Sequence, residues 1–229
     1  MAASGLCGKL PGVKVGILGA TGPAGRGLAA RLAAVGMKVY AGSRDPGRAE
    51  AVVKELAGRF GDRVSRIEPV ANAEAAKAGE IVVLGTKADA TVATAGEHAD
   101  LLAGKPVVSM ANAMRKVGSS FQPVPTQEGS IAAAVQAAAP GALVAAALHH
   151  VPAAAFLNLK QPMAGDVVVV SDHLEALRAT QALVSAMPDL RPLDGGPLEN
   201  ALGLEAFCAV LLTVNHRYGG RATLRLMPT

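Results

Sequence analysis

The sequence predicts an α/β fold, a doubly wound parallel sheet followed by a second, smaller C-terminal α/β domain. Apolar runs alternate with helical patterns along the first two thirds of the chain, as expected for a parallel sheet. A glycine-rich turn, Gly19-Ala20-Thr21-Gly22-Pro23-Ala24-Gly25, follows the first run. The run at residues 81–84 is unbroken, which is typical of a strand covered on both faces.

The expected elements follow one another in order. Strands are expected at 13–18, 37–41, 81–84, 106–109 and 142–148, and helices at 23–35, 46–60, 90–102 and 130–139. Beyond residue 156 the pattern changes, to a strand at 167–170, a helix at 173–187, a short strand at 190–193 and a long helix from 195 to 218. We therefore expect two domains, over residues 13–160 and 161–229.

The glycine-rich turn is typical of a phosphate-binding loop. Glycine tolerates the positive φ that a sharp strand-to-helix turn requires, and its missing Cβ lets a pyrophosphate approach the backbone. Free N–H groups in the first helical turn bind the anion, and Pro23 suits that turn because its missing N–H is not needed there. The spacing is Gly-x-x-Gly-x-x-Gly and not Gly-x-Gly-x-x-Gly, so the flanking strand and helix carry the prediction of a Rossmann domain.

The end of the second expected strand indicates which dinucleotide binds. An NAD site places Asp or Glu there to bind the ribose 2′-hydroxyl, whereas this chain has Ser43 and Arg44, with Arg48 one helical turn on. A hydroxyl and two guanidinium groups would hold a 2′-phosphate. Asp45 is the one acid nearby, and the alternative is a solvated, charged start of a helix. We predict that NADP is the cofactor.

Composition limits the classes of partner. Hydrophobic residues make up 51% of the 229 and charged residues 17%, as in a globular protein. Aromatic residues are only 3%, which argues against stacking platforms for single-stranded nucleic acid. The net charge of +4 comes from dispersed Lys and Arg, so anionic small molecules are the expected partners and nucleic acid is not.

The remaining sequence features point to a cytoplasmic protein without metal or membrane. Cys7 and Cys208 lie at opposite ends without metal-ligand spacing, and a disulfide between them is possible but not suggested. Residues 1–12 lack the apolar core of a signal peptide and are expected to be a floppy extension. The apolar stretch 131–156 is interrupted by polar residues and prolines, so we interpret it as a helix and a buried strand.

Four segments relate the chain to a known family. They are Gly-Ala-Thr-Gly-Pro-Ala-Gly-Arg-Gly-Leu-Ala at 19–29, Gly-Ser-Arg at 42–44, Ala-Leu-His-His-Val-Pro-Ala-Ala at 147–154, and Leu-Arg-Pro-Leu-Asp-Gly-Gly-Pro-Leu at 190–198. The last two lie outside the generic nucleotide fingerprint and therefore carry most of the specificity. On these segments the chain resembles the NADPH-dependent reductases of the deazaflavin coenzyme F420. The actinobacterial members look most similar, through residues 107–113 and the His149-His150 pair.

The resemblance implies hydride exchange between NADP(H) and coenzyme F420, with the C-terminal domain closing the deazaflavin pocket. It implies roles for the glycine turn at the pyrophosphate, for the 43–48 segment at the 2′-phosphate, and for residues after the fifth strand at the nicotinamide and deazaflavin. The expected cofactor-binding residues are Gly19, Thr21, Gly22, Pro23, Ala24, Ser43, Arg44, Arg48, Thr86, Met110, His149, Val151, Pro152, Ala153, Ala206 and Cys208.

The chain departs from the family pattern at two places. Relatives can carry Ser and Thr at the positions of Ala206 and Cys208, so those hydroxyls are lost here. Some relatives carry Ile-Pro-Trp where this chain has Thr86-Lys87-Ala88, so the nicotinamide pocket is expected to differ in shape.

No catalytic side chain is expected. The sequence offers no nucleophile–base pair, paired carboxylates or metal cluster, and direct hydride transfer between two cofactors needs none. Adjacent strand residues point to opposite faces, so at most one of His149 and His150 should face the cleft, and the resemblance favours His149 as a hydrogen-bond donor. Cys208 is expected to be an unreactive core or pocket residue.

The last helix carries three further expectations. His216 and Arg217 at its end complement the helix dipole or contact the anionic deazaflavin tail, and both readings stay open. Glu199 and Glu205 are expected on an ordinary helix surface. Residues 204–214 form a packing face that could bury against a second copy, giving a homodimer.

Two other functions stay open at this point. One is an NADP-linked reductase of a small organic substrate, such as a pyrroline-carboxylate or imine reductase. The other is a non-catalytic NADP-sensing protein.

Overall fold

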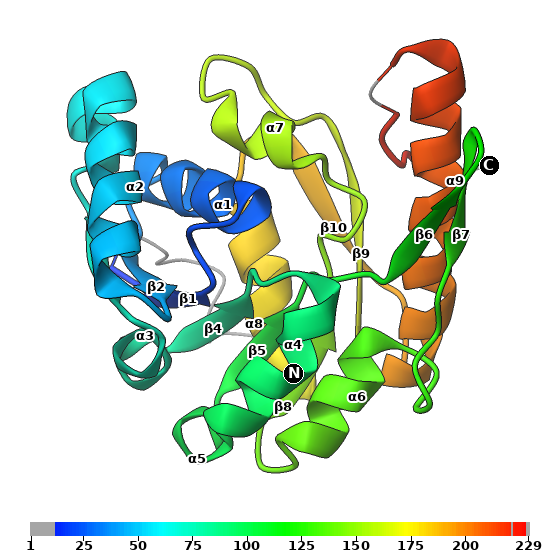
Figure 1. Cartoon of the computed structure of the whole chain (residues 1–229), viewed down its shortest axis with the longest axis horizontal. Helices are drawn as coiled ribbons and strands as arrows, with labels where there is room; N and C mark the ends of the chain where they lie inside the picture. The colour runs from blue at the N-terminus through cyan, green and yellow to red at the C-terminus, as the bar shows by residue number, and fades with distance from the viewer. Residues whose placement is uncertain (1–11, 221, 228–229) are drawn as a thin grey trace, which may run out of the picture.

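Strand β1 (Lys14–Leu18) lies inside an eight-stranded sheet in the computed structural model, which describes residues 12–220 and 222–227 (Figure 1). The order across the sheet is β10 (Leu190–Asp194), β9 (Gly165–Ser171), β8 (Leu143–Ala146), β5 (Pro106–Ser109), β4 (Ile81–Leu84), β1, β2 (Lys38–Ser43) and β3 (Ile67–Ala71). The six strands from β8 to β3 are parallel, while β9 pairs antiparallel with β8 and parallel with β10. This mostly parallel, doubly wound sheet confirms the predicted fold class.

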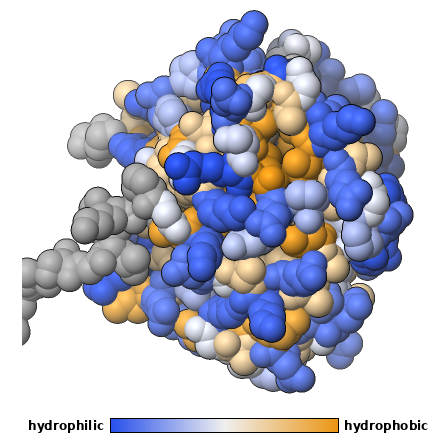
Figure 2. All heavy atoms as spheres, turned by 90° about the vertical axis from the view of Figure 1, so that its left-hand side faces the viewer, coloured by the Kyte–Doolittle hydropathy of each residue, from blue (hydrophilic) through white to orange (hydrophobic). Residues whose placement is uncertain are grey.

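Helices cover both faces of the sheet. One face packs against α1 (Pro23–Ala34), α2 (Pro46–Phe60), α7 (Ala153–Leu157) and α8 (Leu174–Ser185). The other packs against α3 (Asn72–Ala78), α4 (Ala88–Glu97), α5 (Ala99–Leu102), α6 (Ile131–Ala138) and the start of α9 (Ala201–Tyr218). All four residues of β4 are buried, because this strand has a helix layer on either side. Hydrophilic side chains dominate the outer face of the molecule on the side of α2 (Figure 2).

Three segments were missed in the sequence. Strand β3 and helix α3 occupy residues 67–78, and β3 lies at the sheet edge, where Pro69 can be accommodated because no ladder bond is needed on its outer side. A β-hairpin, β6 (Met114–Val117) and β7 (Ser120–Pro123), occupies the stretch expected to be a loop. The one-and-a-half-turn helix α7 follows Pro152.

The sheet is continuous across residue 160, where the chain was expected to divide. Strands β9 and β10 extend the same sheet that carries β1 and β2, whereas α9 stands beside the β6–β7 hairpin at one side of the molecule (Figure 1). The division into two domains stays a prediction.

Helix α9 is apolar on its exposed side and anchored on its buried side. Its segment, Leu198–Tyr218, is the one helical segment within residues 12–220 and 222–227 long and apolar enough to cross a membrane, a test that core helices also pass. Glu205, expected on the surface, is instead buried, because its carboxylate accepts hydrogen bonds from the N–H groups of Ile131 and Ala132 at the start of α6 (2.8 and 3.0 Å). Burial raises the pKa of Glu205, and these two bonds oppose the shift.

Candidate functional site

The carboxyl ends of four neighbouring parallel strands meet at one edge of the sheet. They are the ends of β1, β4, β5 and β8. The chain runs from β1 to β2 on one side of this edge and places β4 on the other, so the connections diverge between β1 and β4. Open α/β sheets bind their ligands at such a switch point.

The glycine turn after β1 lies at that switch point. Gly19 has φ of +79°, and a Cβ there would come within 2.5 Å of Thr86 Cγ2 in the loop after β4, so only glycine fits both the angle and the contact. At Gly22, which caps α1, a Cβ would meet no protein atom closer than 3.6 Å. The fold would therefore accept a side chain at Gly22, and the absence of one leaves the surface open to a ligand.

The first turn of α1 has the properties of an anion site. It holds no acidic residue, its cap makes no side-chain hydrogen bond, and Pro23 occupies the first helical position as predicted. The free N–H groups of this turn and the positive end of the helix dipole therefore face the switch point.

The end of β2 carries the residues expected at a 2′-phosphate. Arg44 and Arg48 are exposed, and no salt bridge within the described part of the chain includes either of them. The Ser43 hydroxyl accepts a hydrogen bond from the N–H of Asp45 (3.2 Å) and keeps its own proton free to donate. Asp45 caps α2 through a hydrogen bond from the N–H of Gly47 (3.0 Å), so the nearby acid serves the helix.

A cavity of about 450 Å³ extends from the glycine turn to α9. Its wall combines the start of α1, the loops after β4, β5 and β8, the start of the hairpin, and one side of α9. The lining residues are Ala24, Thr86, Lys87, Ala88, Met110, Ala111, Asn112, Met114, Leu148, His149, His150, Val151, Pro152, Ala153, Cys208, Leu211, Leu212 and Asn215.

Half of the expected cofactor-binding residues line this cavity. They are Ala24, Thr86, Met110, His149, Val151, Pro152, Ala153 and Cys208. The other expected residues of the glycine turn and those of the 43–48 segment lie outside the lining, after the ends of β1 and β2. Ala206 also lies outside it, because it is two residues from Cys208 and so projects from another side of α9. The roles of these residues stay predictions.

Both histidines of the pair line the cavity, and the expectation that only one would do so is wrong. The pair lies in a turn after β8 and not on the strand, so the alternation of strand side chains does not apply. Leu148, immediately before it, has φ of 67°, an uncommon angle for a residue other than glycine, and this redirects the chain.

The two histidines differ in what they bind. His150 Nε2 donates to the carbonyl of Asp166 (2.7 Å), because a carbonyl can only accept. His149 Nε2 is buried and has no hydrogen-bond partner. Burial, and secondarily the neighbouring His150, lower the pKa of His149 from 6.5 to about 3, so its ring is neutral near pH 7. A buried, unpartnered ring nitrogen in a cavity wall suits a polar group of a ligand.

Asn112 connects three parts of the wall. Its amide donates to the carbonyl of His149 (3.2 Å), and its side chain also reaches the thiol of Cys208 on α9. Burial raises the pKa of Cys208 to about 11, so the thiol stays protonated, as expected for an unreactive pocket residue. Cys7 lies outside the described residues.

Arg31 holds the loop that carries Val151–Ala153 in place. This residue of α1 is almost fully buried, and its guanidinium donates to the carbonyls of Ala155, Phe156, Asn158 and Gln161, at 2.7 to 3.3 Å. These carbonyls belong to α7 and the turn after it. The guanidinium therefore binds the exposed C-terminal carbonyls of a helix whose first residue, Ala153, lines the cavity.

The helical spacing of residues on α9 could have revealed some cavity-lining residues that were not predicted from the sequence. Leu211, Leu212 and Asn215 follow Cys208 at intervals of three, four and seven residues, which places all four on one side of the helix. Lys87 and Asn112 are close in sequence to expected site residues, but their residue types alone did not predict that they line the cavity. Within residues 12–220 and 222–227, no three His, Cys, Asp or Glu side chains group as metal ligands.

The chain is similar to known proteins in both its sequence and its fold. A family model described as NADP oxidoreductase coenzyme F420-dependent matches residues 14–113. The F420-dependent NADP reductase of Methanothermobacter thermautotrophicus is 33% identical over 212 residues, covering 90% of each chain. That of Methanothermobacter marburgensis is 31% identical over 207 residues, covering 89% of this chain and 92% of the relative. An Arthrobacter structure, provisionally described as an F420-dependent NADP-reductase, superposes with a TM-score of 0.79 over 96% of this chain and all of that one, and at 23% identity it shows the shared fold.

Proposed function

The chain belongs to the family of coenzyme F420-dependent NADP oxidoreductases, and on that basis we propose that it transfers a hydride directly between NADP(H) and the deazaflavin coenzyme F420. The observation that carries the proposal is one cavity whose wall includes both Ala24, at the start of α1, and Cys208, on α9. A nicotinamide held from one end and a deazaflavin held from the other would meet in it.

The residues present fit NADP at the first end. The N–H groups at the start of α1 bind the pyrophosphate, and the open space at Gly22 lets it approach. Ser43, Arg44 and Arg48 bind the 2′-phosphate. This assignment gives a role to two arginines that have no acidic partner among the described residues.

The residues present also fit a planar deazaflavin at the second end. His149 Nε2 is free to bond to a polar edge of the ring system, while Val151, Pro152 and Leu212 provide apolar contact. The C-terminal part of the chain closes this side of the cavity through α9, as the proposed domain 161–229 requires.

The protein positions the reacting atoms and excludes water. When bound together, NADPH would supply a hydride from its C4 to C5 of the deazaflavin, and the reduced ring would take up one proton from solvent, so no side chain has to act as nucleophile or proton donor. Asn112 and Arg31 hold the segment after β8 in place, Asn112 through the carbonyl of His149 and Arg31 through carbonyls of α7. Neutral His149 donates or accepts one hydrogen bond without bringing a charge into the cavity.

Isotope transfer tests the proposal. NADPH deuterated at C4 should lose its deuterium to C5 of F420 without exchange with water, as deazaflavin absorbance falls in step with NADPH oxidation. Turnover in which deuterium is lost to solvent would contradict direct transfer. Reduction of imines in place of F420, or NADP binding without any turnover, would favour the alternative reductase or the sensor.

We further propose a cytoplasmic homodimer. The exposed side of α9 carries Leu202, Phe207, Val210 and Val214, which are 37–53% exposed, and a second copy of the same helix would cover them. Light scattering should give twice the monomer mass of 23.0 kDa, and Val210→Glu should halve it. A monomer in the unaltered protein would contradict this. Cell fractionation would test the location.

A further inference from the structure

His150 is tethered to strand β9 by a hydrogen bond that stands where a strand pairing would continue. Strands β8 and β9 pair antiparallel up to Ala146 and Val170, and β8 then ends. Extended by four residues, the same register would bring residue 150 opposite Asp166. The backbone has left the sheet by that point, and the His150 ring donates from Nε2 to the Asp166 carbonyl instead (2.7 Å).

The segment that contains His150 is a wall between two cavities. Residues 150–152 line the large cavity, and they also line a second cavity of about 170 Å³ together with Asp166 and Thr223. A segment with space on both sides lacks part of the packing that fixes side chains in a protein core. The bond to Asp166 therefore helps to set where His150, and His149 before it, lie in the large cavity.

Residues 222–226, which we call the C-terminal segment, bind Asp166 from the other side. The carbonyl of Leu224 accepts a hydrogen bond from the N–H of Asp166 (2.8 Å), and the N–H of Leu226 donates to the Asp166 carboxylate (2.6 Å). Arg191 on β10 donates to both oxygens of that carboxylate (2.8 and 2.7 Å) and to the carbonyl of Leu226 (2.7 Å). Asp166 is buried, and it joins His150 to the C-terminal segment.

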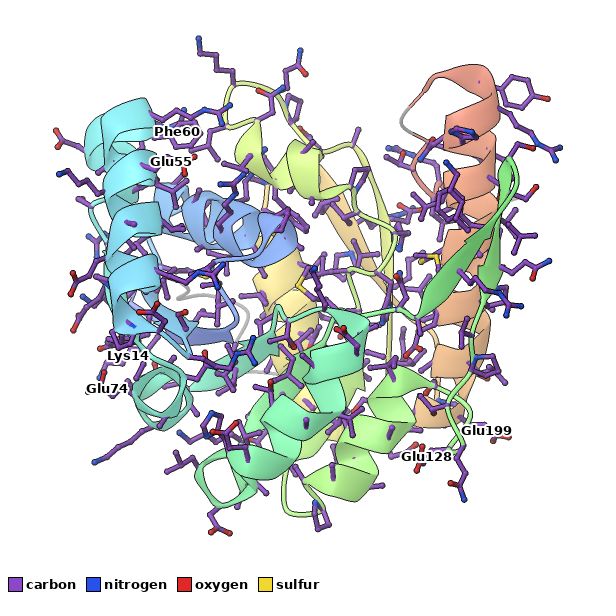
Figure 3. The ribbon with its side chains drawn as sticks, in the orientation of Figure 1. Lys14, Glu55, Phe60, Glu74, Glu128 and Glu199 are labelled. Carbon is purple, nitrogen blue, oxygen red and sulfur yellow. The ribbon has the colours of Figure 1, made fainter. Side chains whose placement is uncertain are left out.

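The C-terminal segment also reaches another wall of the large cavity. After α9 ends, the chain turns back beside that helix (Figure 1), and the N–H of Ala222 donates to the side chain of Asn215, which lines the cavity. Two acids near α9, Glu128 and Glu199, lie at its other end (Figure 3), and the acid that the C-terminal segment meets is Asp166. The segment therefore links two walls, α9 through Asn215 and the histidine turn through Asp166.

An ion pair between neighbouring strands can be purely structural. Strands β9 and β10 are already paired over five residues, however, so the contact between Asp166 and Arg191 is not needed to join them. We propose that Asp166 and the C-terminal segment are positioning residues, which hold His149 and His150 where hydride transfer requires them. The proposal rests on the proposed function, because it assumes that the deazaflavin meets these histidines.

Truncation combined with histidine NMR tests the geometry without any cofactor. Two shortened chains are compared with the full-length protein, one ending at residue 221 and one ending at Met227. The chain ending at Met227 keeps every hydrogen bond described above and is the matched control. With isotope-labelled histidine, the ring signals of His149 and His150 should shift or broaden only in the chain ending at residue 221, while those of His98 and His173 stay unchanged.

Hydride transfer from NADPH to F420 provides the second readout. In the chain ending at residue 221, kcat should fall roughly tenfold, as expected for misplaced reacting groups, and the KM for NADPH should change by less than about twofold. His150→Phe keeps a ring but cannot bond to Asp166, so it should reproduce this loss, and combining it with the truncation should add little. The peptide of residues 222–229, added separately, should restore both the histidine signals and kcat.

A single substitution gives the same test with the chain intact. Leu226→Pro removes the N–H that donates to the Asp166 carboxylate and leaves the rest of the C-terminal segment in place. It should shift the signals of His149 and His150 in the same direction as the truncation and lower kcat by less. Urea unfolding checks that each variant is folded before its kinetics are compared.

The outcomes separate this proposal from the proposed function. Unchanged signals of His149 and His150 in the truncated chain and in Leu226→Pro, or equal shifts of His98 and His173, would overturn the positioning role. Histidine signals that depend on the C-terminal segment, in a protein that transfers no hydride to F420, would refute the proposed function and leave the placement of the histidines standing. F420 turnover that the truncation leaves unaltered would refute the positioning role alone.

Discussion

Acidification should destabilise this protein through His149. The pKa of this side chain is about 3 in the folded state, because the ring is buried, whereas it is 6.5 in the unfolded chain. Between these two values the unfolded chain binds more protons than the folded one, so the free energy of unfolding rises with pH through that window. Stability from His149 is therefore fully present above about pH 6.5 and is lost as the pH falls below it.

The size of the effect follows from the pKa. Each pH unit below 6.5 removes about 1.4 kcal/mol, so the loss at pH 5 is about 2 kcal/mol. Urea unfolding of the apo protein at pH 7.5, 6.5, 5.5 and 5.0 measures it. His149→Gln cannot titrate and should show a shallower slope by about 1.4 kcal/mol per pH unit below 6.5.

The control is His150→Gln. Burial also lowers the pKa of His150, so its own titration adds a slope of the same sign, but the carbonyl of Asp166 opposes the shift and the change should be smaller than for His149→Gln. Parallel pH profiles for the unaltered protein and His149→Gln would refute the claim that His149 is buried and neutral. Bound F420 should leave the order of the variants unchanged if it contacts the neutral ring.

Other perturbations separate cofactor choice, phosphate approach and loop positioning. Arg44→Gln should raise the KM for NADPH roughly tenfold to a hundredfold and leave that for NADH unchanged, as loss of one charge-assisted bond implies; equal effects on both would refute the 2′-phosphate role. Gly22→Ala should retain the unfolding midpoint and weaken NADP binding, whereas Gly25→Ala, whose Cβ would lie 2.6 Å from the Gly19 carbonyl oxygen, should lower the midpoint; the reverse pattern would contradict the geometry. Arg31→Met should cost about 3 kcal/mol of stability and lower kcat, since it leaves four carbonyls without their donor; unchanged kcat in the folded variant would limit Arg31 to a structural role.

Local signals in the sequence were sufficient for the regular elements. The expected helix at 46–60 has the observed bounds of α2, because Pro46 and Gly61 mark its two ends. The expected strands at 81–84 and 106–109 also match β4 and β5, which are short, fully buried apolar runs. Strand β3 was not predicted because Glu68 and Pro69 interrupt its apolar pattern at the sheet edge.

The cavity was only partly predictable, for a physical reason. Its backbone turns carry glycines and prolines, which leave a trace in the sequence. Glu205 and Arg31 look like ordinary surface charges on helices, and only their distant partners, at 131–132 and 155–161, explain their burial. The spacing of residues along one helix cannot predict which backbone groups from a distant part of the chain will bind its side chains.

The length of helix α1 limits which sequence changes this chain can tolerate. Its first turn faces the proposed pyrophosphate site, and Arg31, eight residues after Pro23, holds the loop beside the proposed nicotinamide position, roughly 12 Å along the axis. If NADP binds as proposed, the helix acts as a fixed spacer between the two halves of the dinucleotide. Inserting one residue between them would turn Arg31 by about 100° and lengthen the spacer by about 1.5 Å, so α1 should tolerate exchanges of side chains on its outer face but no change in length.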